Sequence, residues 1–113
     1  MGSVSRSAQS AVMSNGILSD VIRKKNKLAY NVRGAVWYGF GSFFKGKVPF
    51  GDIDILVVCQ TTADVIFIRS NTEDLCMTWP IHVLIMTKAE ESETGFVKFA
   101  GCIELLYIAG TAD

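Results

Sequence analysis

Apolar and polar residues follow one another along the chain with periods that predict helices and strands in turn. Regularly spaced apolar residues, with lysines and an arginine between them, predict a helix from about Ser19. Its expected inner face comprises Ile17, Val21, Ile22, Leu28, Ala29 and Val32. An apolar, aromatic run over residues 35–40, flanked by glycines, predicts a short buried strand. The glycine-rich stretch 41–51 predicts a loop, with room for one helical turn around residues 43–45.

The second half of the chain predicts two more strands and two more helices. Residues 52–59 begin with acids and continue as a β-branched apolar run, which predicts a central strand. Residues 63–75 are ambiguous, because VIFI favours a strand and TEDLCM a helix; we favour a helix, since parallel strands need a crossover. Residues 81–86 (IHVLIM) predict another strand, and a Thr87–Glu90 capping box predicts a last helix. The apolar stripe of that helix is expected to comprise Phe96, Phe99, Ala100, Ile103, Leu106 and Tyr107.

The order of these elements predicts a two-layer α/β (α+β) architecture, with a small mixed β-sheet flanked by helices. A chain of 113 residues suffices for one domain with one core, and we assign that domain to residues 16–113. Residues 1–15 lack the long apolar segment of a secretory signal and are expected to form a flexible, polar lead-in. No apolar stretch approaches the roughly 18 to 20 residues that span a bilayer, so no membrane partner is expected.

Composition and charge narrow the classes of function. Half of the residues are apolar and 19% are charged, which fits a folded globular domain. Eleven basic and eleven acidic side chains cancel, which argues against a tight nucleic-acid partner and requires any anion site to be local. The three cysteines are odd in number and far apart, which favours reduced core thiols in a cytoplasmic protein. The high apolar content also leaves room for a homodimer interface.

Two acids open the predicted central strand. Asp52 and Asp54 lie two residues apart, so their carboxylates are expected on one face, about 7 Å apart. Carboxylate oxygens in this arrangement suit Mg²⁺ or Mn²⁺. Two acids at the head of an apolar strand are costly unless they are paired, which also favours a metal. The alternative is a solvated start of the strand.

The loop before these acids has features of a phosphate site. Gly41 has no Cβ, so a phosphate can approach the backbone, and the Ser42 hydroxyl can bind its oxygens. Lys45 and Lys47 add positive charge in the same loop. The alternatives are an ordinary turn and a pair of solvated lysines.

The run YGFGSFFKGKVPFGDIDILVV, residues 38–58, resembles the signature of the polymerase-β-type nucleotidyltransferase superfamily. That signature is a hydrophobic residue, Gly, Gly or Ser, then a gap of some nine to thirteen residues and Asp-hydrophobic-Asp-hydrophobic. Here Ser42 and Asp52 are separated by nine residues, and the likeness is strongest to minimal, single-domain bacterial members. The resemblance implies that Gly41 and Ser42 lie at the phosphates of a nucleoside triphosphate, and that Asp52 and Asp54 bind magnesium. The implied reaction transfers a nucleoside monophosphate to a hydroxyl.

One departure from the family pattern bears on catalysis. Active members usually carry a third carboxylate on a later strand, where this sequence has His82. A histidine with its ordinary pKa near 6.5 can act as general base, or can simply lie beside the pocket. Asp64, Glu90 or Glu91 are other candidates for the missing acid. Two functions therefore stay open: a transferase, or a catalytically degenerate nucleotide-binding or regulatory module of a two-protein system, in which a partner protein supplies the acceptor site.

Overall fold

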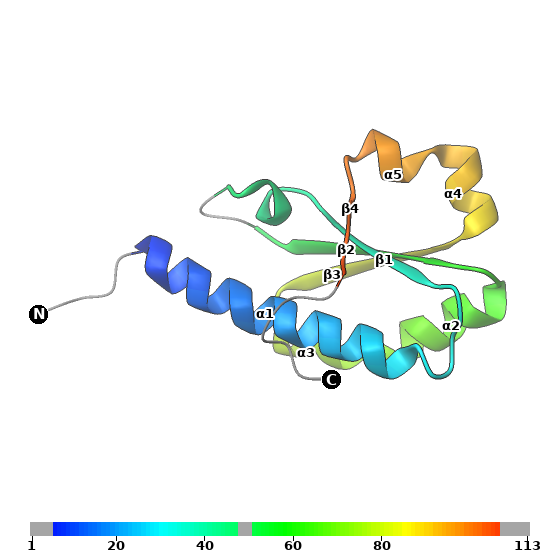
Figure 1. The fold of residues 1–113 in the computed structure, drawn as a ribbon, viewed down its shortest axis with the longest axis horizontal. Coiled ribbons are helices and arrows are strands. Elements are labelled where there is room, and N and C mark those ends of the chain that lie inside the picture. Colours follow the sequence, from blue (N-terminus) through cyan, green and yellow to red (C-terminus); the bar gives the residue numbers. More distant parts are fainter. Residues whose placement is uncertain (1–5, 48–50, 107–113) are drawn as a thin grey trace, which may run out of the picture.

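The computed structural model describes residues 6–47 and 51–106 of the chain (Figure 1). In chain order the elements are α1 (Arg6–Leu28), β1 (Val36–Phe40), the 3-10 turn η1 (Phe43–Lys45), β2 (Ile53–Cys59), α2 (Thr62–Asn71), α3 (Glu73–Thr78), β3 (Ile81–Thr87), α4 (Lys88–Thr94), α5 (Phe96–Phe99) and β4 (Ile103–Glu104).

The strands form one mixed sheet in the order β3-β2-β1-β4. Strand β1 is antiparallel to both β2 and β4, whereas β2 and β3 run parallel. The parallel pair is connected through α2 and α3, as a crossover requires. The predicted mixed sheet with flanking helices is confirmed.

The core lies between the sheet and the layer of α1, α2 and α3, which cover one of its faces (Figure 1). Alternate residues of β2 point into this core and are fully buried: Ile53, Ile55, Val57 and Cys59. Helix α1 and the turn after it contribute the expected inner face except Ala29, which is exposed. Leu56 and Val58, on the opposite face of β2, are also buried, which explains why the run is continuously apolar.

Helix α1 begins much earlier than expected. It starts at Arg6 rather than near Ser19, so residues 6–15 are helical, whereas residues 1–5 lie outside the described part. The segment before Gly16 contains alanine, glutamine and methionine and no proline, so little opposes a helix. Gly16 does not end the helix, and the Trp79 ring packs beside it, about 3.5 Å from where a Cβ would lie.

The ambiguous segment 63–75 is helical, as favoured, but it forms two helices. Thr61 caps α2 by accepting a hydrogen bond of 3.1 Å from the Asp64 N–H. Thr72 lies at the junction between α2 and α3, buried, with its hydroxyl donating to the Ile68 carbonyl at 2.9 Å. A side-chain hydroxyl that binds the backbone in this way often bends a helix, which fits the break at this residue.

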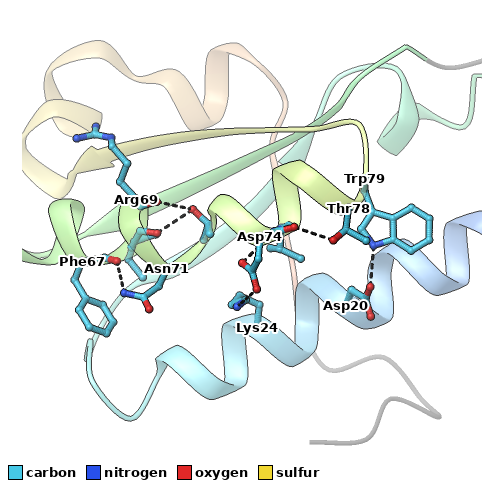
Figure 2. Close-up of polar contacts among 11 residues, drawn as sticks. Asp20, Lys24, Phe67, Arg69, Asn71, Asp74, Thr78 and Trp79 are labelled. Carbon is cyan, nitrogen blue, oxygen red and sulfur yellow. Dashed lines mark hydrogen bonds and ion pairs between the residues drawn. The ribbon is translucent and has the colours of Figure 1, made fainter.

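Helix α3 is tied to α1 by two polar contacts (Figure 2). The Lys24 ammonium group lies 2.6 Å from the Asp74 carboxylate, and the hydrogen bond from Lys24 lowers the pKa of Asp74. The Trp79 indole N–H donates to Asp20 at 2.8 Å. These contacts fix the two helices over the same end of the core.

The carboxyl-terminal region differs from the single helix expected there. The Thr87–Glu90 capping box is confirmed, but α4 ends at Gly95, whose φ is +64°. After the short α5 the chain forms β4, and the Leu105 N–H donates to the Trp37 carbonyl at 2.8 Å. The predicted stripe on a single helix is therefore wrong. Phe99, Ile103 and Leu106 are exposed, Phe96 and Ala100 are half-buried, and Tyr107 lies outside the described residues. A free edge of β1 is available to this segment, and pairing with it replaces a continued helix.

Candidate functional site

The second acid of the predicted pair lies on the sheet face opposite α1, α2 and α3. Its neighbours in β2, Ile53 and Ile55, point into the core, so Asp54 points to the other face. There it is flanked by Phe40 on β1 and His82 on β3, the partners that the strand register gives it. The Asp54 side chain is 27% exposed, so it is partly desolvated but accessible.

The first acid, Asp52, precedes the strand. The prediction that β2 includes Asp52 is wrong by one residue, because the ladder starts where the Ile53 N–H donates to the Pro80 carbonyl at 2.8 Å. Asp52 is exposed in the bend before this bond. The two acids are thus both near the amino-terminal end of β2, one held in the sheet and one in solvent.

The glycine turn touches the carboxylate. Gly41 follows β1 with a φ of +83°, a conformation that favours glycine. A Cβ added there would lie 2.5 Å from Oδ2 of Asp54, so no other residue fits without displacing that carboxylate. The turn and Asp54 therefore face each other directly.

The rest of the loop is anchored by aromatic packing. The Phe44 ring occupies the space where a Cβ of Gly39 would be, and it packs edge to face with Phe43 at 5.0 Å. Both rings pack against the core. The loop that carries the turn is thereby held at the end of β1.

Ser42 lies between the glycine turn and η1. Its hydroxyl makes no capping hydrogen bond, whereas its carbonyl accepts from the Lys45 and Lys47 N–H groups at 3.2 Å and 3.1 Å. Both lysines are exposed, and neither forms an ion pair with any residue that the structure describes. The loop thus offers one hydroxyl and two exposed cations within six residues of the Gly41 turn.

His82 lies beside Asp54 in the sheet. It is the register partner of Asp54 across the parallel strands, and its Nδ1 is 3.8 Å from Oδ1 of Asp54. That separation is longer than a hydrogen bond, and the imidazole is 70% exposed. An imidazole with this exposure is accessible to a ligand bound beside Asp54.

None of the other candidate acids adjoins Asp54. Asp64 lies in the first turn of α2, at the opposite end of β2, where its N–H donates to the Thr61 hydroxyl. Glu90 accepts from the Thr87 N–H and hydroxyl, and Glu91 accepts from the Val97 N–H at 3.1 Å. The carboxylates of Glu90 and Glu91 are thus used locally in the structure.

The donor set fits a magnesium ion that retains other ligands. Over residues 6–47 and 51–106, no three His, Cys, Asp or Glu side chains converge as a metal group would require. Magnesium in nucleotide sites is commonly held by one or two carboxylates, with waters and phosphate oxygens completing its shell. Asp54, with Asp52 beside it in the chain, can supply those carboxylates but not a closed cage.

An aromatic pair beside Asp54 was missed from the sequence. Phe40, the register partner of Asp54, packs edge to face with Phe96 of α5 at 5.2 Å. The next residue on this face, Tyr38, has its pKa raised by burial and by the nearby carboxylates of Glu104 and Glu91. The alternation from Tyr38 to Phe40 signalled a shared face, but only the fold brings Phe96 to it.

The cysteines match the expectation of core thiols only in part. Cys59 is buried, and burial raises its pKa to about 11. Cys76 is exposed and Cys102 is half-buried, and all three are free thiols.

Comparison with protein families, with curated proteins and with solved structures finds no match to the chain. What the structure itself defines is a mixed α/β fold with a four-stranded sheet, in which a glycine turn abuts a strand carboxylate. None of its described helices is long and apolar enough to cross a bilayer.

Proposed function

We propose that the chain has the nucleotidyltransferase fold and binds a magnesium–nucleoside triphosphate at the turn between β1 and η1, transferring a nucleoside monophosphate to a hydroxyl acceptor. The observation that carries this proposal is the direct approach of Gly41 to Asp54. It joins the two halves of a signature that are separated in the sequence by a nine-residue gap.

The strand arrangement adds support. The glycine turn ends β1, the acids open the antiparallel β2, and His82 lies beside Asp54 on the parallel β3. Phosphoryl and nucleotidyl transfer require mainly positioning and charge neutralisation, and these groups are of the right kind for both.

Each residue has a distinct role in this proposal. Gly41 lets the backbone of the turn come close to Asp54 and to the metal that this carboxylate would hold, and the Ser42 hydroxyl donates to a phosphate oxygen. Lys45 and Lys47 offset the negative charge of the triphosphate. Magnesium, held by Asp52 and Asp54, would supply the remaining charge neutralisation.

His82 is the proposed base for the acceptor. The acceptor oxygen attacks the α-phosphorus, the bond to the β-phosphate bridging oxygen breaks, and pyrophosphate leaves. The His82 imidazole takes the hydroxyl proton in this step. Manganese would substitute for magnesium, since both prefer oxygen ligands.

A second candidate is a nucleotide-binding or regulatory module without turnover, paired with a partner protein. It is favoured by one observation: the position beside Asp54 on β3 holds an exposed imidazole instead of a carboxylate. In this case binding persists while transfer is absent.

Calorimetric titration with ATP, GTP, CTP and UTP, with and without magnesium, tests binding. We expect magnesium-dependent binding that Asp52→Asn weakens and Asp54→Asn abolishes. Asp64→Asn is the matched control, because it removes one carboxylate at the other end of β2. If no nucleotide binds at millimolar concentration, both candidate functions fail.

Pyrophosphate release with a panel of hydroxyl acceptors then separates the two candidates. Release that His82→Ala abolishes, without a loss of nucleotide affinity, supports the transferase. Binding without release by the chain, alone and with co-purified partners, supports the module.

A further inference from the structure

The last part of α1 and the turn after it carry a local excess of positive charge. Residues 23–33, RKKNKLAYNVR, contain five basic and no acidic side chains, in a chain whose net charge is zero. Cations in the last turn of a helix interact favourably with its dipole, which accounts for Lys25 and Lys27. The dipole does not account for the cations before and after that turn, nor for the aromatic residue among them.

Two of these cations form ion pairs within the fold. The Lys24 ammonium group lies 2.6 Å from the Asp74 carboxylate, and the Arg23 guanidinium lies 2.9 Å from Asp20, the one acid of α1. The Arg23 side chain is nevertheless 51% exposed. Lys27 is exposed and forms no ion pair with any residue that the structure describes. Positive charge therefore remains available on the outer side of α1.

Four side chains on that outer side surround a hollow of about 450 Å³, here called the α1 hollow. The described residues that line it are Arg23, Asn26, Lys27 and Tyr30. The first three recur three and four residues apart, which places them on one face of the helix, and Tyr30 follows in the turn after it. No acid lines the α1 hollow among the described residues.

Tyr30 gives the α1 hollow an aromatic surface. Its side chain is 88% exposed, so most of the ring is in contact with solvent and open to a ligand. An accessible ring beside cations is the combination with which proteins hold single-stranded nucleic acids, because bases stack on the ring and the cations bind the phosphates. The volume of the α1 hollow lies within the range of pockets that accept a molecule of nucleotide size.

The groove between α1 and α3 is less suited to an anion. It measures about 250 Å³ and shares Arg23 and Lys27 with the α1 hollow, but Asp20 and Asp74 also line it. Each acid pairs with a cation of α1, and Figure 2 shows the contact of Asp74 with Lys24. Acids and cations thus largely offset one another there, whereas the α1 hollow has no acid of its own.

We propose that the α1 hollow binds a single-stranded nucleic acid, with one base stacked on the Tyr30 ring and the adjoining phosphates held by Arg23 and Lys27. An acidic peptide would satisfy the cations but has no base to stack on the ring. An anionic membrane is disfavoured because none of the four side chains is aliphatic and able to enter lipid. The net charge of zero argues against tight binding, so we expect a weak, salt-dependent complex.

This proposal does not rest on the proposed nucleotide site. Helix α1 covers the sheet face opposite the one to which Asp54 points. Binding at the α1 hollow is therefore measured without magnesium and without nucleoside triphosphate, and Asp54→Asn should bind the strand as the wild-type chain does. Failure of either site leaves the other measurable.

Fluorescence anisotropy with a labelled single strand of about ten thymidines tests the proposal. We expect a Kd of about 1–100 µM at physiological salt, and an affinity that falls as salt rises. Lys27→Gln should weaken binding and lower the slope of log Kd against log salt concentration by about 0.7, because one phosphate contact is lost. Tyr30→Ala should weaken binding roughly fivefold or more and leave that slope unchanged, because it removes stacking and no charge.

Helix α5 supplies matched controls on the other side of the sheet. Phe99 is 88% exposed, as Tyr30 is, and Lys98 is exposed, as Lys27 is. Their neighbour Phe96 packs on Phe40, the register partner of Asp54, so α5 lies over the face opposite α1. Phe99→Ala and Lys98→Gln should bind the single strand as the wild-type chain does. All four substitutions replace exposed side chains, so coincident unfolding curves are expected.

Competing ligands decide between the classes of anion. A duplex of the same length should bind more weakly than the single strand, because its stacked bases cannot reach Tyr30. Polyglutamate and vesicles of phosphatidylserine and phosphatidylcholine should bind more weakly still, without a loss in Tyr30→Ala. No binding of the single strand, equal losses in the α5 controls, an unchanged affinity of Tyr30→Ala, or tighter binding of polyglutamate or vesicles would each overturn the proposal.

Discussion

Replacing Gly41 with alanine perturbs the point where the turn meets the carboxylate. At a φ of +83° a Cβ is strained, at a cost of about 1–2 kcal/mol. Alanine also lowers the entropy of the unfolded chain, which offsets about 0.4–1 kcal/mol of the cost of the backbone strain. The added methyl group would lie 2.5 Å from Oδ2 of Asp54, so the carboxylate must rotate from its position.

The loss of stability that this collision adds can be measured against a matched control. Gly46 lies in the same loop with a φ of +76°, and a Cβ there would meet nothing within 4 Å. Gly46→Ala therefore carries the backbone strain alone. Forcing Asp54 off its rotamer adds about 0.5–1.5 kcal/mol, so we expect Gly41→Ala to lose that much more stability.

Denaturant unfolding of both variants gives the difference in the free energy of unfolding, and calorimetry with magnesium and ATP gives the effect on binding. Gly41→Ala should lose nucleotide affinity, whereas Gly46→Ala should keep most of it. In an Asp54→Ala background the two glycine substitutions should destabilise equally. Equal stability and equal nucleotide affinity of Gly41→Ala and Gly46→Ala in the wild-type background would refute the proposed contact.

Three further predictions concern the scaffold. Gly39→Ala should lower the free energy of unfolding by about 1–3 kcal/mol in urea titrations, because its methyl group overlaps the Phe44 ring; a loss below that range would contradict the packing. The hydrogen bond from Lys24 lowers the Asp74 pKa below its ordinary 3.8, so its stabilisation is complete above that pH and is lost as the pH falls through the folded-state value. The destabilisation of Lys24→Met should accordingly shrink in strong acid, and a pH-independent loss would exclude this ion pair as its cause. Because the Cys59 pKa is raised to about 11, a thiol reagent near neutral pH should label Cys59 only after unfolding, and its labelling in the native state would contradict this burial.

Local sequence patterns were sufficient to predict the elements whose structure depends on residues close together in the chain. The aromatic run before Gly41 and the apolar run after Asp54 form β1 and β2, because each is short, apolar and bounded by turn residues. The Thr87 capping box also formed, since its two hydrogen bonds join residues three apart. The resemblance placed His82 where a third acid is expected, and in the structure the parallel pairing of β2 with β3 makes His82 the register partner of Asp54.

Elsewhere the outcome depends on long-range contacts that no window of sequence contains. The spacing from Phe96 to Leu106 fits a helix, but Gly95 adopts a left-handed conformation and the open edge of β1 pairs with residues 103–104. The ion pair between Lys24 and Asp74 joins residues 50 apart. The contact of Gly41 with Asp54 is also long-range, and in the sequence only the spacing between the glycine turn and the acids indicated it.

The most direct test of the central claim is an amide-resolved NMR titration of the chain with ATP and magnesium. The account predicts that the resonances of Gly41, Ser42 and Asp54 shift together, and that the shifts disappear without magnesium or in Asp54→Asn. Shifts confined to another surface, such as the groove between α1 and α3 lined by Lys24 and Asp74, or no shifts at all, would contradict it.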